Sequence, residues 1–328
     1  MRVLVTGATG FIGGHLLSPL AAAGHSLSIG LRKAESACQL APPVRTAART
    51  IVVGEVDAYT DWRQALEGVD AVIHLAAHAH QLGKGADDEA AFLRVNADGT
   101  ARLVEQSIEA GVGRFILMSS IGAVTSACDA RITIETRCEP ETAYGRSKLA
   151  GERALKERAK GTPMAWTILR PTLVYGPGNP GNMERLISLV LRGVPLPLGA
   201  IRNRRSLTYV DNLVSATLAA LAHRGADNST FLVADGQDVS TPELVRRIAA
   251  LAETRTRVVS VPLPLLRGLA RGADVLSALT TMSLPFDTAT LQRLQSSLYV
   301  DVEPLRVTLG WTPPFSLDQG LRCMLTPS

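Results

Sequence analysis

The sequence predicts an α/β protein: a doubly wound parallel sheet with a smaller C-terminal α/β domain. Two observations favour this fold class. Short apolar runs recur between helix-length segments, and their apolar residues are consecutive, as expected for strands that are buried on both faces of a parallel sheet. A glycine-rich turn joins the first run directly to the first helical segment. Strands that alternate with helices in this way pair in parallel through right-handed crossovers.

The elements are expected in a regular order up to Pro171. Strands are predicted at 3–6, 27–31, 51–53, 71–75, 115–118, 166–169 and, later, 230–233. Helices are predicted at 13–23, 62–66, 97–110, 142–159, 183–191, 242–252 and within 262–284. Prolines punctuate the chain after Pro171, so we expect a first domain over 1–171, segments near 205–235 that return to it, and a second domain mainly over 172–328.

Composition and charge argue against several classes of protein. The 328 residues, 46% of them hydrophobic, suffice for a sizeable core. The net charge of +4 comes from interspersed charges, so we expect no nucleic-acid partner. The apolar stretch 262–284 carries charged residues, so we expect a packed helix and no membrane insertion. His78 and His80 lack a third ligand, and the four cysteines are scattered, so we expect no metal and a cytoplasmic protein without a signal peptide.

The first motif is a G-x-x-G-x-x-G turn formed by Gly7, Gly10 and Gly13 between a predicted strand and a predicted helix. Such a turn lets the backbone approach a pyrophosphate closely. The N-terminus of the following helix offers free N–H groups and the positive end of its dipole to the phosphates. Residues 1–171 are therefore the expected dinucleotide-binding domain.

The residues after the second predicted strand bear on the choice between NAD and NADP. Sites for NAD usually place Asp or Glu there, where the carboxylate bonds the ribose 2′-hydroxyl. This chain has Arg32 and Lys33 instead, and its first acid is Glu35. The two cations favour NADP(H), because they could hold its 2′-phosphate, and NAD(H) is the alternative.

The second motif is Tyr144-Gly-Arg-Ser-Lys148, which follows Ser119-Ser120. Tyr144 and Lys148 are four residues apart in a predicted helix, so they share one face. A free phenol has a pKa of about 10, and an ammonium at ~5 Å stabilises the phenolate by roughly 3 kcal/mol at an effective dielectric of about 20. Ser120, at the end of the 115–118 strand, can bond a substrate oxygen. We therefore predict proton transfer by Tyr144, coupled to hydride transfer with a nicotinamide.

These motifs resemble those of the extended short-chain dehydrogenase/reductase family, in its NAD-dependent epimerase/dehydratase branch, which acts on nucleotide sugars. The resemblance covers essentially the whole chain, in blocks at 6–13, 74–77, 95–100, 144–148 and 169–176. It implies a Rossmann-like fold, with Ser120, Tyr144 and Lys148 as the catalytic residues. The expected cofactor-binding residues, from the turn, Arg32 and the resemblance together, are Gly7, Gly10, Phe11, Ile12, Gly13, Arg32, Glu55, Val56, Leu75, Ala76, Ala77, Asn96, Tyr144, Lys148, Thr172 and Leu173. The implied substrate-binding residues are Ser120, Asn182, Met183, Arg205 and Arg293.

Five stretches are most similar to bacterial UDP-N-acetylquinovosamine 4-dehydrogenases, which are UDP-4-keto-6-deoxy-sugar 4-reductases; they lie at 119–121, 175–179, 195–199, 202–207 and 309–314. After Ser120 the chain also lacks the Val-Tyr-Gly that many family members have there. This resemblance implies reduction of the C4 keto group of a UDP-2-acetamido-2,6-dideoxy-hexos-4-ulose by NAD(P)H. The reaction would belong to the synthesis of bacterial surface polysaccharide (O-antigen) precursors, and the enzyme would be a homodimer with a UDP-sugar as its partner.

Two other functions remain open from the sequence. A UDP-hexose 4-epimerase would use the same three catalytic residues and recycle NAD internally, so net consumption of added cofactor separates it from a reductase. A non-catalytic, dinucleotide-binding regulator would share the fold. Such proteins usually lose the tyrosine or the lysine, and this chain retains both Tyr144 and Lys148.

Overall fold

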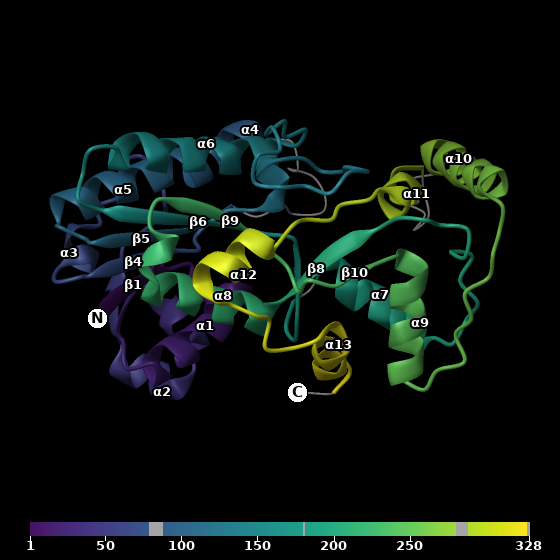
Figure 1. Cartoon of the computed structure of the whole chain (residues 1–328), viewed down its shortest axis with the longest axis horizontal. Helices are drawn as coiled ribbons and strands as arrows, with labels where there is room; N and C mark the ends of the chain where they lie inside the picture. Colours follow the sequence, from purple (N-terminus) through teal and green to yellow (C-terminus); the bar gives the residue numbers. More distant parts are fainter. Residues whose placement is uncertain (79–87, 180, 280–287, 327–328) are drawn as a thin grey trace.

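The computed structural model describes residues 1–78, 88–179, 181–279 and 288–326 (Figure 1). Its main body is a seven-stranded sheet with the strand order β3-β2-β1-β4-β5-β6-β9. All neighbouring pairs in this sheet are parallel. The strands are β1 (Arg2–Thr6), β2 (Ser26–Leu31), β3 (Arg49–Val52), β4 (Ala71–His74), β5 (Arg114–Met118), β6 (Ala165–Pro171) and β9 (Ser229–Val233). The predicted Rossmann-like, doubly wound sheet is confirmed.

Helices cover both faces of this sheet (Figure 1). On one face lie α3 (Arg63–Leu66), α4 (Glu89–Leu93), α5 (Thr100–Glu109) and α6 (Ala143–Ala159). On the other lie α1 (Phe11–Ala22), α2 (Pro42–Ala47), α8 (Val210–Ala222) and α12 (Glu303–Leu309). Short turns of other helix types are Ala34–Gln39, Arg94–Gly99, Ile121–Ala123 and Arg224–Ala226, of which Arg94–Gly99 is a π-helix.

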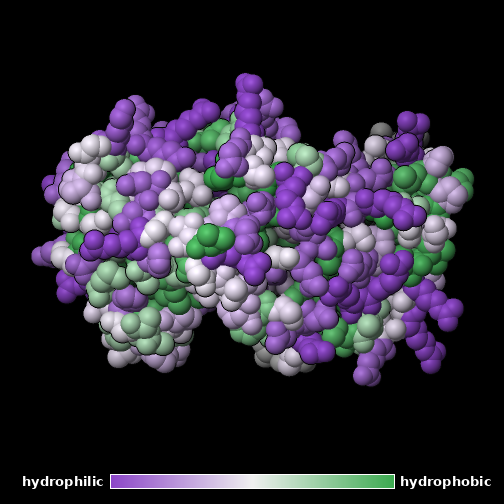
Figure 2. All heavy atoms as spheres, viewed as in Figure 1, coloured by the Kyte–Doolittle hydropathy of each residue, from purple (hydrophilic) through white to green (hydrophobic). Residues whose placement is uncertain are grey.

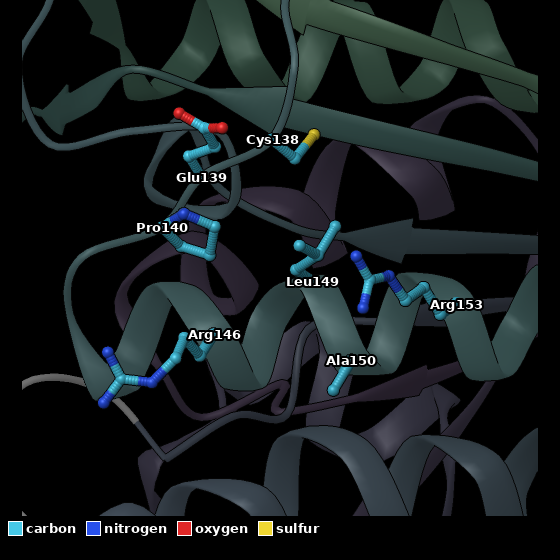
Figure 3. Close-up of a pocket in the computed structure, with 7 residues that line it drawn as sticks. All are labelled: Cys138, Glu139, Pro140, Arg146, Leu149, Ala150 and Arg153. Atoms are coloured by element: carbon cyan, nitrogen blue, oxygen red, sulfur yellow. The ribbon is translucent and has the colours of Figure 1, made fainter.

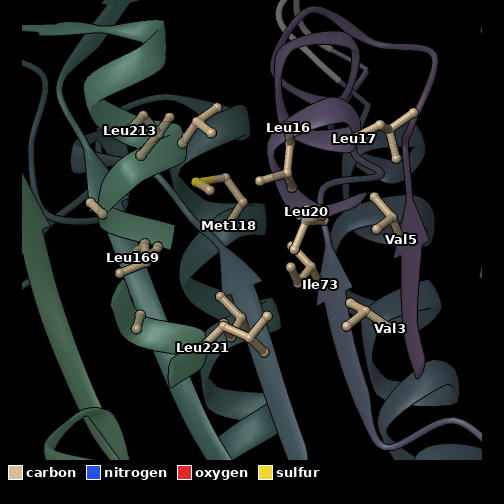
Figure 4. Packing of buried hydrophobic residues seen from close by; sticks show 14 of the residues in the cluster. Val3, Val5, Leu16, Leu17, Leu20, Ile73, Met118, Leu169, Leu213 and Leu221 are labelled. Atoms are coloured by element: carbon tan, nitrogen blue, oxygen red, sulfur yellow. The ribbon is translucent and has the colours of Figure 1, made fainter. Parts of the chain in front are cut away.

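The apolar core has one layer on each side of the sheet. Figure 4 shows the layer beneath α1 and α8, where Leu16, Leu20 and Leu213 meet Val5 and other strand residues. The opposite layer packs α3, α5 and α6 on alternate residues of the same strands and encloses Trp62. Because each central strand is buried on both faces, its sequence reads as a continuous apolar run.

A second, three-stranded sheet stands beside the first, in the order β10-β8-β7. Its strands are β7 (Leu173–Tyr175), β8 (Arg205–Tyr209) and β10 (Asp238–Val239), and the helices around it are α7 (Asn182–Leu191), α9 (Thr241–Leu251), α10 (Leu263–Leu279), α11 (Thr288–Gln295) and α13 (Leu317–Leu325). The sequence did not predict this sheet. The helix expected within 262–284 corresponds to α10, and residues 280–287 lie outside the described residues.

Segments from the second half of the chain belong to the main sheet. The strand β9 pairs with β6, and α8 packs on α1. The division at residues 171 and 172 stays a prediction. Within the described part of the chain, no helix combines the length and apolar content needed to cross a lipid bilayer. The face seen in Figure 2 is largely polar, with apolar residues in small scattered groups.

Candidate active site

The glycine-rich turn lies at the carboxyl end of β1, between β2 and β4, where the strand order reverses and ligands of such folds bind. Gly7 has a φ of +68°, and a Cβ on it would lie 2.6 Å from the backbone nitrogen of Ala76. The N–H of Gly10 donates to the carbonyl oxygen of Gly7 at 3.0 Å, and no side chain caps α1. The first N–H groups of α1 are therefore available to an anion, which fits a dinucleotide pyrophosphate.

A cavity of about 600 Å³ adjoins this turn, and the residues that line it are Thr9, Gly10, Phe11, Gly14, His15, Pro177 and Gly178. His15 connects its walls, because Nδ1 lies 3.0 Å from Asp211 Oδ1 and Nε2 lies 3.2 Å from the carbonyl oxygen of Pro177. The hydrogen bond with Asp211 raises the pKa of His15. Phe11 thus lines the cavity, whereas Ile12 packs against the core.

The predicted ribose-side residues 75–77 follow β4, and a buried polar chain fixes them. His74 Nδ1 lies 2.7 Å from Thr6 Oγ1, and its Nε2 lies 3.0 Å from Thr100 Oγ1. Burial lowers the pKa of His74 to about 3, so the ring is neutral near pH 7. The N–H of Ala76 donates to Thr6 Oγ1 at 3.2 Å, which fixes this segment beside the turn.

Asn96 links the segment after β4 to α6 by hydrogen bonds. Its Oδ1 accepts from the N–H of His78 at 2.8 Å, and its Nδ2 donates to Ser147 Oγ at 2.9 Å. Asn96 therefore links the chain after β4 to the residue that precedes Lys148. His80 lies outside the described residues, and among those described no three His, Cys, Asp or Glu side chains gather as metal ligands would.

Ser120, Tyr144 and Lys148 come together at the carboxyl end of β5. Ser120 Oγ and the Tyr144 ring both lie within 4 Å of the place that a Cβ on Gly122 would take, and burial raises the Tyr144 pKa more than Ser120 lowers it. Lys148 Nζ donates to the carbonyl oxygen of Met118 at 2.7 Å. Burial lowers the pKa of Lys148 to about 8, against an opposing effect of the Glu152 carboxylate. The phenol is therefore protonated near pH 7.

Arg32, which the sequence suggested could hold a 2′-phosphate, is paired with a carboxylate at the end of β2. The Arg32 guanidinium lies 3.6 Å from the Glu55 carboxylate, and both side chains are about two-thirds exposed. The next residue, Val56, packs against Gly99, where a Cβ would lie 2.6 Å from Val56 Cγ1. Arg32 and Glu55 therefore form one paired edge of the site.

Thr172 and Leu173 lie where β6 passes into β7. Thr172 is buried, with its Oγ1 2.8 Å from Thr208 Oγ1, so it joins β7 to β8. The Leu173 side chain is 39% exposed, which leaves it free to contact a ligand.

The predicted substrate residues other than Ser120 lie around the second sheet, and their side chains differ in exposure. Asn182 begins α7 and is exposed, whereas Met183 is 4% exposed and packs in the core of this lobe. The role of Asn182 and Met183 in substrate binding stays a prediction. Arg205 Nη2 donates to the carbonyl oxygen of Arg293 and to Ser296 Oγ. The two predicted arginines thus lie together.

A buried polar group next to the catalytic residues was missed from the sequence. The Glu152 carboxylate accepts from Ser119 Oγ and from the Arg170 guanidinium. The available signal was the position of Glu152, four residues after Lys148 on the same helical face.

A cavity of about 430 Å³ lies alongside α6, between the helix and residues 138–140, with Cys138 at its edge (Figure 3).

Comparison with known proteins identifies the family. The model of the NAD dependent epimerase/dehydratase family matches residues 3–234. The chain belongs to this family. The finer assignment to 4-dehydrogenases is not part of this match.

Two similar sequences and one similar structure are informative. The chain is 34% identical to "UDP-glucose 4-epimerase" of Vibrio cholerae over 98% of this chain and 93% of that protein. It is 27% identical to "N-acetyl-alpha-D-glucosaminyl-diphospho-ditrans,octacis-undecaprenol 4-epimerase" of Escherichia coli O157:H7, over 98% of this chain and 93% of that one. The structure of "MoeE5 in complex with UDP-glucuronic acid and NAD" is 27% identical, with a TM-score of 0.74 and coverage of 99% and 98%.

Proposed function

We propose that this protein is a UDP-hexose 4-epimerase. The observation that carries the proposal is the placement of Ser120 beside Tyr144, with the buried Lys148 four residues further along the same helix, at the strand edge that also holds the glycine-rich turn. The 34% identical relative bears the name of this activity, and a second relative is also named a 4-epimerase. Together these favour epimerisation over the reduction that the resemblance of five short stretches implied.

In this proposal Tyr144 carries the proton and Ser120 orients the oxygen at C4. A bound nicotinamide would supply the hydride acceptor and donor for this chemistry. Tyr144, as phenolate, takes the C4 hydroxyl proton while the C4–H bond breaks, which gives a 4-keto sugar. It returns the proton to the same oxygen when hydride arrives on the opposite face of the sugar. Burial keeps the phenol protonated in the free enzyme, so phenolate formation needs the nearby positive charges of Lys148 and the oxidised cofactor.

The substrate diphosphate is proposed to lie between Asn182 and the paired Arg205 and Arg293. The planar guanidinium group suits phosphate oxygens, and Arg205 is already oriented by Ser296. The relatives named above act, by their names, on sugars joined to a diphosphate. We extend the proposal to sugars that feed surface polysaccharide synthesis in the cytoplasm.

We propose NAD(H) as the cofactor, and this revises the expectation of NADP(H) from Arg32. The pairing of Arg32 with Glu55 supports the revision, because it places a carboxylate where a 2′-phosphate would add negative charge. The neighbouring structure with UDP-glucuronic acid also holds NAD. Tighter binding of NADP⁺ than of NAD⁺ in a fluorescence titration would reverse this assignment.

A 4-reductase is the second candidate, because the segment after Ser120 departs from the Val-Tyr-Gly of many family members. In the structure this segment is a 3-10 turn in which Ile121 and Val124 are buried. The deciding experiment incubates the protein with UDP-glucose, UDP-galactose and their N-acetyl analogues, and then with UDP-4-keto sugars and NADH. Interconversion of the hexoses without net change in nicotinamide absorbance supports the epimerase, and stoichiometric oxidation of NADH by a keto sugar supports the reductase.

A homodimer through helices of the main sheet is also proposed. The cavity alongside α6 has an apolar part at Pro140, Leu149 and Ala150, which a second copy can cover (Figure 3). Light scattering of the purified protein measures the state directly, and a monomer at micromolar concentration would contradict the proposal.

A further inference from the structure

We propose that Glu152 is a positioning residue for the catalytic group: its buried carboxylate fixes the carboxyl end of β5 and thereby the orientation of Ser120 toward Tyr144. The inference rests on the proposed catalytic role of Ser120, Tyr144 and Lys148, and it adds a residue to which neither the family match nor the sequence motifs gave a role.

This inference rests on the contacts between one face of α6 and residues 118–120 at the end of β5. Tyr144, Lys148 and Glu152 are spaced by four along α6, so they form one stripe. Lys148 Nζ donates to the carbonyl oxygen of Met118 at 2.7 Å, and the Glu152 carboxylate accepts from Ser119 Oγ at 2.5 Å. Tyr144 lies beside the next residue, Ser120, whose side chain lowers the Tyr144 pKa. Two consecutive residues of the strand end are thus hydrogen-bonded to the stripe, and the third lies against its first residue.

Arg170 holds the Glu152 carboxylate in place from the next strand. Its Nε donates to Oε1 at 2.8 Å and its Nη2 donates to Oε2 at 2.6 Å. The two side chains are only 5% and 1% exposed. A buried ion pair of this kind is weak evidence for net stability, because desolvation offsets the attraction. Its geometric effect is clear: one carboxylate joins α6, β5 and β6 directly beneath Ser120.

Glu152 also acts on the charge of Lys148. Its carboxylate opposes the burial that lowers the pKa of Lys148 to about 8. The other titratable or charged groups facing this cluster are Arg170 from β6, Cys138 from the segment before α6, and His74 from β4. His74 is neutral near pH 7, so Glu152 is the anion among these groups that keeps Lys148 protonated. Without it, Lys148 loses its proton at a lower pH.

Two variants distinguish a role of Glu152 in positioning Ser120 from a role in stability alone. Ser119→Ala removes the hydrogen bond between Glu152 and the strand end and leaves the Glu152–Arg170 pair intact. Glu152→Gln removes the negative charge of residue 152. We expect each variant to lower kcat about 100-fold with KM changed less than threefold, because small misplacement of reacting groups costs about this much. In Glu152→Gln the alkaline limb of the kcat profile moves to lower pH. The matched control is Glu157→Gln, an exposed glutamate of α6, which leaves kcat and the profile unchanged.

A readout without substrate keeps this test independent of the proposed function. Tyr144 ionisation is followed by ultraviolet absorbance, with Tyr144→Phe as the blank. Ser120 lowers the Tyr144 pKa, so we expect a displacement of Ser120 in Ser119→Ala to raise that pKa. A lower melting temperature with an unchanged Tyr144 titration and unchanged kcat in both variants would overturn the proposal. If wild type converts no UDP-hexose, the proposed function fails, and the Tyr144 titration still decides the role of the network.

Discussion

Tyr144 is the residue on which the proposed chemistry depends, and its surroundings oppose its ionisation. The ring packs edge-on against Phe92 with centroids 6.0 Å apart, and burial raises its pKa. The sequence predicted that Lys148 would favour the phenolate. In the structure the Lys148 ammonium donates to the carbonyl oxygen of Met118, and the neighbouring Ser120 is the side chain that lowers the Tyr144 pKa. The spacing of the motif identified the participants, but the hydrogen-bond partners depend on the strand end, which the motif does not contain.

The first prediction concerns this phenol. Tyr144→Phe removes the hydroxyl while it keeps the ring, and we expect kcat to fall between about 10²- and 10⁴-fold, the usual contribution of general acid–base catalysis. NAD binding and melting temperature should change little. The control is Tyr59→Phe, because Tyr59 is 90% exposed. Full turnover of the Tyr144→Phe protein in the epimerase assay would rule out the mechanism.

At the scale of elements, α6 is the helix that assembles the site. Thr142 caps it, with Oγ1 accepting from the N–H of Gly145 at 3.0 Å. Gly145 lets the helix approach closely, because a Cβ there would lie 2.2 Å from the carbonyl oxygen of Gly122. The sequence pattern predicted this helix nearly to its ends. It could not show that a glycine in the helix serves close packing rather than weakening the element.

The second prediction tests that approach. Gly145→Ala forces α6 away from the turn that carries Ser120, so we expect lower stability and at least a tenfold lower kcat. Alanine normally stabilises a helix relative to glycine by about 1 kcal/mol, so the sign of the effect is informative. Gly268→Ala in α10 is the matched control, since nothing lies within 4 Å of its added Cβ. Urea unfolding of both variants gives the comparison, and a stabilised, active Gly145→Ala protein would contradict the packing argument.

The predicted strands of the main sheet are confirmed, while the second sheet went unnoticed for identifiable reasons. The strand β7 has three residues and is separated from the end of β6 only by Thr172, so its sequence resembles a continuation of β6. The strand β8 begins Arg205-Ser206, which breaks the apolar run, although Ser206 and Thr208 are buried. Both polar side chains are satisfied by hydrogen bonds to Asp238 and Thr172. Burial of such residues depends on partners distant in sequence, which periodicity alone does not reveal.

At the scale of the molecule, the proposed site divides its ligands between two sheets. The glycine-rich turn and residues 75–77 belong to the main sheet, and Arg205 begins β8 of the second.

The third prediction follows from this division. Arg205→Gln should raise KM for a UDP-hexose about 10- to 100-fold, the value of a hydrogen bond to a charged group, and leave NAD affinity unchanged. The exposed neighbour Arg202, changed to Gln, is the control. An equal loss of NAD affinity would show that the two sheets do not bind separately.

The fourth prediction concerns Asp235, which joins the two sheets. Its carboxylate accepts from the N–H of Tyr209 and from Asn212 Nδ2, both at 2.8 Å, and burial raises its pKa from 3.8 to about 6. The folded protein therefore holds this proton more tightly than the unfolded chain does. Stability from Asp235 is fully present below pH 4 and is lost as pH rises through 6, by about 3 kcal/mol in all.

Asp235→Asn isolates this contribution, because carboxylates with lowered pKa values change stability in the opposite direction in both proteins. Asn keeps an oxygen for the Tyr209 N–H and carries no charge at any pH. We expect the stability of the variant relative to wild type to improve by about 2.4 kcal/mol between pH 4 and pH 7. Urea unfolding at both pH values measures it, with exposed Asp129→Asn as the control. A difference that is independent of pH would mean that Asp235 ionises in the folded protein as it does in the unfolded chain.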